Sequence, residues 1–385
     1  MQRRLFEVDH EAYRETVREF LSREIEPNYD QWENERLVDR SAWLAAGKSG
    51  IIGLSVPENV GGSGVIDYRF RVVVAEEIAR TGTTSFGAGL SIQDDIVIPY
   101  IVHLGTAEQQ ARWLPAMATG ERIGAIAMTE PGAGSDLQGV KTTAVRDGDE
   151  WVINGQKTFI TNGIHSDIVI VVCRTDPNAG SKGFSLIVVE RDTPGFSRGR
   201  KLHKVGLAAQ DTAELIFEDV RVPAENLLGT EGKGFIHLME NLPLERISIA
   251  VAATAAARAA YTWTEGYVFE RTAFGKRIGD LQNTRFALAE MLTEIEVTES
   301  HIDRGVLALN AGGLTGVDAS KAKWWASELQ KRIVDRCVQL HGGYGYMMEY
   351  PIGRAYVDGR VQTIYGGTTE IMKEIIGRDI ASKFT

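Results

Sequence analysis

The stretch from residue 247 to residue 260 constrains the fold of this 385-residue chain more than any other. It consists of Ile, Val and Ala, interrupted only by Ser248, Thr254 and Arg258. A helix made of these residues has no polar face, and such a helix is usually buried by other elements. The segment therefore predicts a buried helix, against which other parts of the chain must pack.

Glu245 stands at the head of this predicted helix. At helical spacing it shares a face with Ile249, Ala252 and Ala256. A carboxylate that enters apolar packing loses solvation, so its pKa rises toward the range in which it can take a proton. The structural alternative is a buried Glu paired with a nearby Arg, and on spacing alone this is the more frequent case.

Composition excludes several classes of function. The formal net charge of −10 argues against DNA or RNA as a partner. Cys173 and Cys337 form no C-x-x-C pair and no disulfide framework, which fits a reducing compartment. No histidine has zinc-site spacing to another ligand, no apolar run is long enough to span a membrane, and the N-terminus has no signal-peptide core. We therefore expect a cytoplasmic protein without a metal site.

Hydrophobic periodicity divides the chain into three parts. Residues 9–125 follow a helical period, with short helical pieces at 42–47 and 70–79. From about residue 126 the period changes to two, and strand segments are expected at 168–172, 184–189 and from 215 onward, with Pro223 closing the region. Long helices follow Gly234, and they are expected at about 246–270, 280–309, 318–340 and 369–382.

Four long helices joined by short loops indicate an antiparallel bundle. We therefore predict a mainly α chain with a central β-domain: an N-terminal helical domain over residues 1–125, a middle β-domain over 126–233 and a C-terminal helical bundle over 234–385. Within the β-domain, Asn154-Gly155 separates two strand segments. This dipeptide readily adopts the positive φ angles of a tight turn, so it predicts a β-hairpin.

Three glycine-containing segments could carry chemistry. The backbone N–H groups of the loop Met128–Asp136 could cradle an anion, although the loop lacks the G-x-G-x-x-G pattern of a Rossmann site. Phe159 and Thr161 share one face of a strand end, where they could stack on and hydrogen-bond to a flat heterocycle. Gln339–Gly345 ends a helix in a glycine turn. Each segment alone also has a structural explanation, as a turn, a strand end or a helix cap.

In combination and in order, these segments resemble the acyl-CoA dehydrogenase family. The resemblance covers essentially the whole chain and rests on six motifs: Met128–Asp136, Phe159–Gly163, Glu245–Val251, Arg271–Gly275, Gln339–Gly343 and Tyr365–Glu370. Four further segments are similar to the long-chain branch of that family: Lys201–Leu207, Ala209–Leu215, Ala326–Gln330 and Ile371–Glu374.

The resemblance implies an FAD bound between the β-domain and the bundle. The flavin and its phosphates would contact the Gly-rich loop and the strand end, through Met128, Thr129, Gly132, Gly134, Ser135, Phe159, Ile160 and Thr161. The FAD of a neighbouring subunit would contact Arg271, Phe274, Gln282, Gln339, Leu340, His341, Gly342 and Gly343. Thr368, Thr369 and Glu370 would lie beside the cofactor. The acyl-CoA substrate would contact Ser135, Lys182, Gly183, Pro243, Arg246, Gly366 and Gly367.

One departure from the family pattern bears on the base. Many members carry the catalytic Glu at the position that is Gly366 here, and glycine cannot act as a base. The long-chain and isovaleryl branches instead carry a Glu just before an Arg on the bundle helix, which is Glu245 here. The resemblance thus implies that Glu245 removes the α-proton of the thioester while hydride leaves the β-carbon for flavin N5. The product is a trans-2-enoyl-CoA.

The resemblance also implies a homotetramer, built as a dimer of dimers, and electron-transfer flavoprotein as the electron acceptor. Two other functions stay open at this point. One is a flavoprotein of the same fold with oxidase or monooxygenase chemistry, and the other is a scaffold without catalysis. The acyl length, branched or steroid side chains, and a carrier-protein thioester in place of CoA also stay open.

Overall fold

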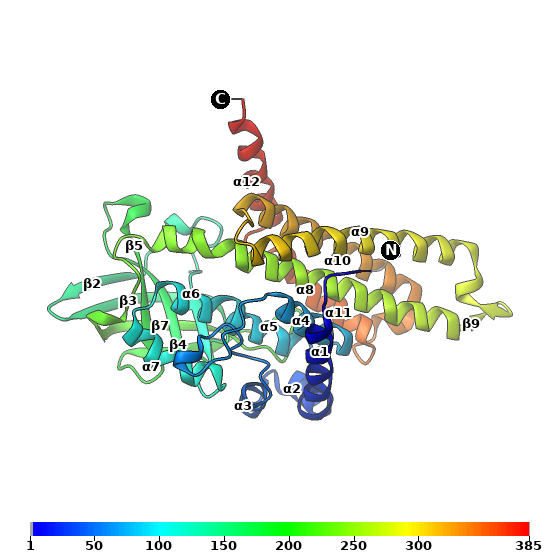
Figure 1. Cartoon of the computed structure of the whole chain (residues 1–385), viewed down its shortest axis with the longest axis horizontal. Helices are drawn as coiled ribbons and strands as arrows, with labels where there is room; N and C mark the ends of the chain where they lie inside the picture. The colour runs from blue at the N-terminus through cyan, green and yellow to red at the C-terminus, as the bar shows by residue number, and fades with distance from the viewer. Residues whose placement is uncertain (1–2, 385) are drawn as a thin grey trace.

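The computed structural model describes residues 3–384 and shows three regions along the chain, as predicted (Figure 1). Met1, Gln2 and Thr385 lie outside the described residues, and with them the first two residues of the predicted N-terminal domain. The N-terminal region is helical. Its main helices are α1 Val8–Phe20, α2 Glu26–Glu35, α3 Arg40–Lys48, α4 Arg69–Thr81, α5 Thr84–Ser91, α6 Ile98–Leu104 and α7 Ala107–Ala118. The helical pieces predicted at 42–47 and 70–79 are therefore confirmed as α3 and α4.

The middle region is an eight-stranded, mostly antiparallel sheet. Seven strands follow the order β6-β7-β3-β2-β4-β5-β8, and β1 pairs with β4 in parallel. The strands are β1 Gly124–Ala127, β2 Thr143–Asp147, β3 Glu150–Thr161, β4 Ile168–Arg174, β5 Phe184–Glu190, β6 Phe196–Lys201, β7 Thr212–Pro223 and β8 Leu227–Leu228. The predicted segments at 168–172 and 184–189 are thus β4 and β5, and Pro223 does close β7.

The hairpin predicted at Asn154-Gly155 is wrong. These residues lie inside the continuous strand β3, and the turn comes earlier, at Gly148, where Asp147 pairs with Glu150. The register against β7 shifts between Ile153 and Gly155, which marks a bulge. A Cβ on Gly155 would lie 2.4 Å from Thr142 Oγ1. The glycine is needed there for a close approach of two strands and not for a turn.

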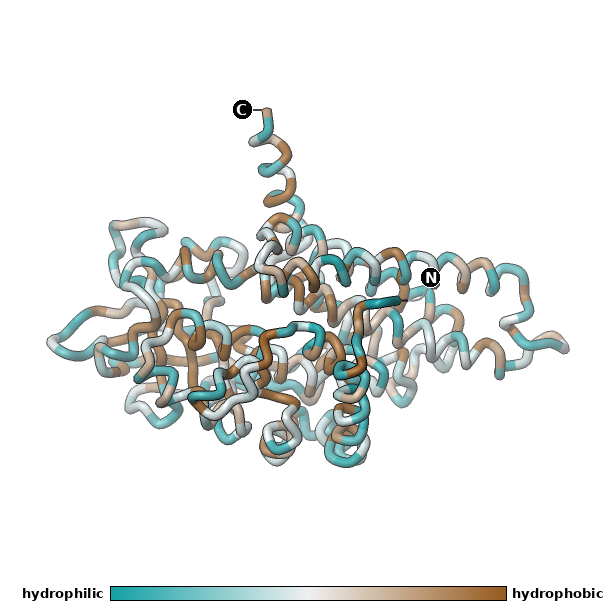
Figure 2. The backbone as a smooth tube through the Cα atoms, viewed as in Figure 1, coloured by the Kyte–Doolittle hydropathy of each residue, from teal (hydrophilic) through white to brown (hydrophobic). Residues whose placement is uncertain are grey.

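Strands β4 and β5 are covered on both faces. One face packs with α6 and α7 around residues such as Ile170, Leu186 and Trp113. The other face packs inside the sheet, where Val171 and Ile187 contact residues of β3 and β7. Burial on both faces explains why these strands are apolar without alternation. Figure 2 shows the same pattern, with hydrophobic segments inside the β-domain and largely hydrophilic loops at its outer end.

The C-terminal region is a helical bundle around α8 Gly234–Glu270. The other long helices are α9 Gln282–Asn310 and α10 Gly316–His341, and α11 Pro351–Gly359 packs against both α8 and α10. The buried helix inferred from residues 247–260 is therefore confirmed at the centre of the bundle. It begins earlier than expected, because its first turns bury His237, Leu238 and Asn241, and it continues through Pro243.

The last predicted helix exists, but it packs differently from the expectation. Helix α12 spans Thr369–Ser382, and it contacts α10 through its beginning, where Thr369 and Met372 are buried. The rest of α12 projects from the body of the chain (Figure 1). The fourth member of the bundle is instead the short α11, which the hydrophobic pattern did not predict. Helix α11 packs against both α8 and α10, and these two contacts fix its position.

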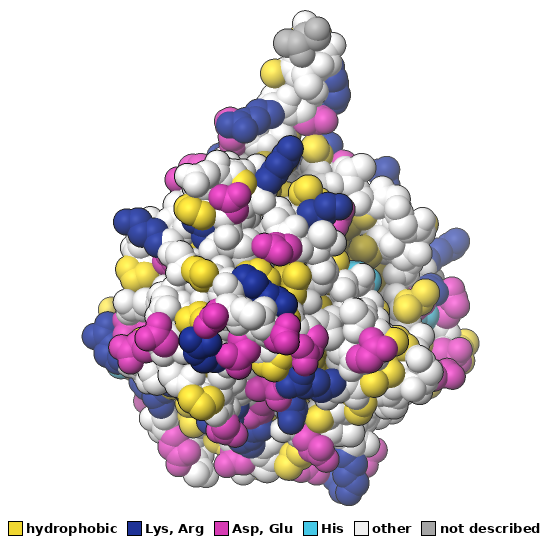
Figure 3. Space-filling view, turned by 90° about the vertical axis from the view of Figure 1, so that its left-hand side faces the viewer, with side chains coloured by type: hydrophobic (Ala, Val, Ile, Leu, Met, Phe, Trp, Pro, Cys, Tyr) yellow, Lys and Arg dark blue, Asp and Glu magenta, His cyan; other side chains and the backbone are white. Residues whose placement is uncertain are grey.

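The surface carries charges of both signs. Figure 3 looks onto the β-domain end of the molecule and shows Lys and Arg interspersed with Asp and Glu, with the C-terminal helix standing above. Across residues 3–384, no helix has the length and apolar character needed to cross a membrane. The same residues contain no cluster of three or more His, Cys, Asp or Glu that could hold a metal ion.

Candidate active site

Glu245 lies on α8 and is buried against α6. The residue is 3% exposed, and its Oε1 accepts a hydrogen bond of 2.9 Å from the Tyr100 hydroxyl. Burial raises the pKa of Glu245 to about 7, while the hydrogen bond from Tyr100 and the charge of Arg246 act in the opposite direction. A carboxyl group with this pKa can take a proton near neutral pH.

The pairing of Glu245 with a nearby Arg is not observed. Within residues 3–384 no ion pair joins Glu245 to a basic side chain, although Arg246 is its neighbour in sequence. Adjacent residues on a helix point in different directions, so the two side chains do not face each other. Arg246 instead donates to Ser320 Oγ of α10 at 3.2 Å, and its Nε has no hydrogen-bond partner in this part of the chain. Burial lowers the pKa of Arg246, and Glu245 opposes that change.

The turn Gly366–Gly367 lies against α8 beside the base. Both glycines have positive φ, +63° and +97°. A Cβ on Gly366 would lie 2.3 Å from Cδ1 of Ile249, which is one helical turn beyond Glu245. Gly367 O accepts a hydrogen bond of 2.6 Å from Lys323 Nζ. The turn thus lies against Ile249, one helical turn beyond Glu245, and is held from α10 by Lys323.

Lys323 is a residue of the site that the sequence analysis missed. It is fully buried on α10, and burial lowers its pKa to about 8, helped by the positive charge of Arg246. It lies three residues after Ser320, the partner of Arg246, so both contacts come from one face of α10. A signal was present in the sequence, because a lysine at a buried position of a predicted helix needs a specific acceptor.

The Gly-rich loop after β1 is clamped to β3 by a buried ion pair. Glu130 accepts hydrogen bonds from Lys157 Nζ at 2.9 Å and from the backbone N–H groups of Lys141 and Thr142. Lys157 also donates to Met128 O at 3.0 Å. The N–H of Thr158 donates to Thr129 O at 2.9 Å, directly before Phe159. The predicted flavin contacts Met128, Thr129 and Phe159 are therefore brought together.

The surface made by this loop and β3 fits a flat, phosphate-bearing ligand such as FAD. A Cβ placed on Gly132 or Gly134 would meet no atom within 4 Å, so both glycines border open space. Phe159 is 67% exposed and has a φ of +60°, which is unusual for an aromatic residue. Ile160 is buried in the core and Thr161 is half-buried. Ser135 is exposed at the end of the loop.

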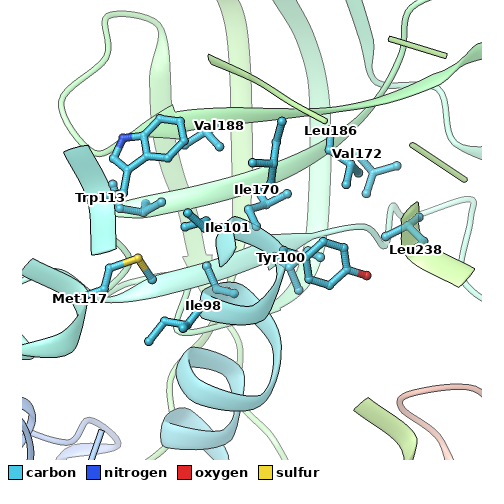
Figure 4. Packing of buried hydrophobic residues seen from close by; sticks show 14 of the residues in the cluster. Ile98, Tyr100, Ile101, Trp113, Met117, Ile170, Val172, Leu186, Val188 and Leu238 are labelled. Atoms are coloured by element: carbon cyan, nitrogen blue, oxygen red, sulfur yellow. The ribbon is translucent and has the colours of Figure 1, made fainter. Parts of the chain in front are cut away.

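An apolar cluster joins the Gly-rich loop to Glu245. It contains Tyr100 of α6, Ala133 of the loop and Leu238 of α8, and Met128 packs against it. Figure 4 shows the ring of Tyr100 at the edge of this cluster near Leu238, with its hydroxyl pointing outward. The partner of Glu245 and a residue of the Gly-rich loop therefore belong to one continuous apolar cluster.

A second group of predicted cofactor residues lies at the opposite end of α8. Arg271 directly follows α8, ~39 Å along the helix from Glu245 at 1.5 Å per residue. A pocket of about 540 Å³ is lined there by Arg271 and by all of Gln339, Leu340, His341, Gly342 and Gly343. The His341 ring stacks on Tyr267 with 4.3 Å between ring centroids.

Two further predicted cofactor residues are exposed near the end of α8. Phe274 is 92% exposed and has a positive φ at the tip of the β9–β10 hairpin (Thr272–Ala273 and Lys276–Arg277). Gln282 is exposed at the start of α9.

The remaining predicted residues lie at the start of α12 and on α8. Thr368 caps α12 by accepting from the Ile371 N–H, Thr369 donates to Glu328 at 2.9 Å, and Glu370 is exposed. Pro243 lies two residues before Glu245 on α8.

Lys182 and Gly183 precede β5, near the beginning of α8. A Cβ on Gly183 would lie 2.0 Å from Asp176 O, which accounts for that glycine without a substrate.

Fold and site together define a protein with a buried carboxyl group of raised pKa and a glycine-lined surface bordering open space. Comparison with protein-family models adds three matches: acyl-CoA dehydrogenase N-terminal domain at residues 7–121, middle domain at 125–220 and C-terminal domain at 232–381.

The chain is 51% identical over 380 residues to the long-chain specific acyl-CoA dehydrogenase of Sus scrofa mitochondria, covering 98% of this chain and 88% of that protein. A crystal structure of an acyl-CoA dehydrogenase from Geobacillus kaustophilus matches with a TM-score of 0.96 and 51% identity, covering 98% and 100% of the two chains. An acyl-CoA dehydrogenase from Bacillus anthracis, solved in complex with FAD, matches with a TM-score of 0.92 and 32% identity, covering 98% and 68%. The chain belongs to the acyl-CoA dehydrogenase family, and it is an oxidoreductase.

Proposed function

We propose that this enzyme dehydrogenates a long-chain fatty acyl-CoA to the trans-2-enoyl-CoA, with Glu245 as the base. The observation that carries the proposal is the state of Glu245. It is buried, its pKa is raised to about 7, and its partner is a neutral tyrosine hydroxyl. A structural glutamate would be expected to pair with a cation instead.

FAD is the cofactor of this family and of this enzyme. When bound, it accepts the hydride equivalent that leaves the β-carbon of the acyl chain. Thr129, Gly132, Gly134 and Ser135 would hold it on the loop side, and Phe159 with Thr161 would hold it on the strand side. The open space at the two loop glycines and the exposed ring of Phe159 support this assignment.

The protein's own contribution is to supply a base for the α-proton and a hydrogen-bond donor for the thioester carbonyl oxygen. The α-proton of a thioester is weakly acidic, so a developing enolate needs stabilisation as well as a base. We assign the stabilising donor to the N–H of Gly366, with Gly367 held in position by Lys323. Pro243, Arg246, Lys182 and Gly183 are assigned to the walls of the substrate site.

The finer parts of the proposal follow from similarity to the long-chain enzymes. They are the preference for long acyl chains, electron-transfer flavoprotein as acceptor and a homotetramer built from dimers. The two separated groups of cofactor residues support the last of these, because one FAD at Glu245 leaves the Arg271 pocket free for a neighbour's FAD. We also propose that the three domains meet between residues 125 and 126 and between residues 233 and 234.

The experiment is anaerobic bleaching of the flavin on addition of a long-chain acyl-CoA. Glu245→Gln keeps the volume of the side chain, so an unchanged FAD content of the oxidised enzyme serves as the control. We expect the bleaching rate to fall roughly 10²–10⁴-fold, which is the usual contribution of a general base.

If Glu245→Gln bleaches as fast as the wild type, Glu245 is a structural residue and the proposal fails. A panel of acyl-CoA chain lengths with an artificial electron acceptor tests the long-chain preference. Rapid oxygen consumption by the reduced enzyme would instead favour an oxidase.

A further inference from the structure

Two hydrogen bonds join α6 to α8 across the candidate active site. Tyr100 Oη donates to Glu245 Oε1 at 2.9 Å, and His103 Nδ1 lies 3.0 Å from Asn241 Oδ1. Tyr100 and His103 are one turn apart on α6, and Asn241 and Glu245 are one turn apart on α8. The later residue of α6 pairs with the earlier residue of α8, so the two helices are antiparallel here. Of the two contacts, only the first reaches the carboxyl group of Glu245.

The hydroxyl of Tyr100 has one function within residues 3–384. The side chain is fully buried, and its ring packs among apolar residues such as Ile101 and Leu238. Those contacts would be satisfied equally well by phenylalanine. Within residues 3–384 the only hydrogen bond of the hydroxyl goes to Glu245. Burial raises the pKa of Tyr100, and the charge of Glu245 and the hydrogen bond to it add to this rise. A buried hydroxyl that serves one acceptor is a specific feature and not a filling group.

Few other groups act on Glu245. Arg246, on the same helix, is the one charged side chain of the described chain whose field affects its pKa. On α10, Lys323 is directed to Gly367 O and Ser320 to Arg246. The π-helical turn Ile92–Val97 also packs against α8, but its Asp95 is paired with Arg71 at 3.1 Å.

We infer that Tyr100 is a positioning residue for proton transfer, because its hydroxyl holds one oxygen of Glu245 and leaves the other oxygen free to face the substrate. The inference rests on the proposed role of Glu245 as base. The bond also stabilises the ionised carboxylate, since a hydroxyl donates to a charged acceptor more strongly than to a neutral one. Tyr100 thus sets both the orientation of the base and the pH range in which it is ionised.

The test is Tyr100→Phe, measured as kcat/KM against pH with a long-chain acyl-CoA. Loss of the hydroxyl removes a contact that favours the ionised form, so the pKa of Glu245 rises and the acidic limb moves to higher pH. We expect a movement of about one unit or more, in line with the strength of a charge-assisted hydrogen bond. Starting from a pKa of about 7, a one-unit movement lowers the ionised fraction at pH 7 roughly fivefold. At alkaline pH the rate recovers toward that of the wild type.

A direct readout of protonation accompanies the kinetics. Infrared difference spectra between each protein and its Glu245→Gln version isolate the carboxylic acid band of Glu245 as pH is varied. In Tyr100→Phe we expect this band to persist to higher pH by the same interval as the kinetic limb.

Two matched controls separate this effect from general damage to the packing. His103→Phe removes the other hydrogen bond between α6 and α8, and Tyr29→Phe removes a different buried hydroxyl, which accepts from the Ser85 N–H at 2.9 Å. Both are expected to leave the acidic limb in place, even where the melting temperature falls.

The outcomes separate the role of Glu245 as base from the role of Tyr100 as positioning residue. If Glu245→Gln retains wild-type turnover, the proposed base is wrong and the role of Tyr100 falls with it. If Glu245→Gln is inactive but Tyr100→Phe keeps both the wild-type limb and the wild-type infrared titration, the inference about Tyr100 alone is overturned. A lower plateau with an unmoved limb in Tyr100→Phe also overturns it, because that is the result of a purely structural role.

Discussion

At the scale of single residues, Glu245 shows how burial and one hydrogen bond act on a carboxyl group in opposite directions. Burial raises its pKa, and the Tyr100 hydroxyl moderates the rise, leaving a value of about 7. A base with a pKa near the working pH is ionised often enough to react and basic enough to hold a proton. The same property has a cost in stability, because a buried carboxylate above that pH has lost its hydration.

This cost predicts a pH-dependent gain in stability for Glu245→Gln. The folded-state pKa of about 7 lies above the ordinary value of 4.5, so the folded state binds more protons between these values. The contribution of Glu245 is therefore fully present below about pH 4.5 and is lost as the pH rises through 7. Glutamine does not titrate. The free energy of unfolding of the variant, measured relative to the wild type, should therefore rise by up to about 3 kcal/mol from pH 5 to pH 8.

Paired thermal or urea unfolding at the two pH values measures this difference. Asp94 and Asp358 also have pKa values raised to about 6 by burial, but they are common to both proteins and cancel in the comparison. A difference between variant and wild type that stays constant with pH would show that Glu245 is not ionising in this range.

At the scale of elements, the site is a meeting of α6, α8, α10 and the turn before α12. The turn Gly366–Gly367 fits only because it has no side chains, since both φ angles are positive and Ile249 of α8 stands directly against it. Lys323 holds the turn from the other side through Gly367 O. A side chain at position 366 would therefore need both Ile249 and the backbone of the turn to move.

This arrangement predicts how the base can be moved. On the Glu245→Gln background, Gly366→Glu should restore part of the lost turnover, because its carboxylate starts from the same side of the site. The recovery should be limited by the clash with Ile249 Cδ1 at 2.3 Å and by the strained φ of +63°. Ile249→Val deletes that one atom, so the triple variant should recover more than the double variant.

Turnover of the four combinations, with and without Gly366→Glu and Ile249→Val, measures the effect. Ile249→Val alone should cost only about 0.5–1.5 kcal/mol of stability, or less because the residue is half-buried. If the triple variant is no better than the double variant, contact with Ile249 is not what keeps a side chain out of this position.

At the scale of the whole molecule, the predicted cofactor residues fall into two groups at opposite ends of α8. Arg271 and Gln339–Gly343 line one pocket, while Ala133 of the Gly-rich loop shares an apolar cluster with Tyr100, the partner of Glu245. One FAD at Glu245 would leave the Arg271 pocket empty in its own subunit. The separation therefore favours an assembly in which each pocket serves the cofactor of another copy.

A shared site predicts complementation between two inactive variants. Glu245→Gln lacks the base, and Arg271→Ala weakens the contact to the neighbour's FAD. In a mixed assembly, the subunit with intact Glu245 can receive intact Arg271 from its partner, so some sites are complete. Co-expression of the two variants should restore activity that neither has alone, and light scattering should find an oligomer. A monomer with full flavin content, or a mixture that gains nothing, would contradict the shared site.

Much of the architecture followed from local pattern in the sequence. The all-round apolar stretch from 247 to 260 required a buried helix, and the strands at 168–172 and 184–189 followed from β-branched runs. Asn154-Gly155 misled because its glycine answers a steric demand from Thr142, which directly precedes β2. The place of α12 could not be predicted either, because an amphipathic period does not say what a helix packs against.

The sequence by itself determined which groups are present in the site: a carboxylate at the head of an apolar helix, a glycine in place of the alternative base, and a Gly-rich loop. Each of these is a local property, visible within a few residues of its own segment. Only the tertiary structure decided that the partner of Glu245 is Tyr100, 145 residues away in sequence, and not the adjacent Arg246. The physical reason is that hydrogen bonding depends on distance and direction in space, and neighbours on a helix point apart while distant helices can meet face to face.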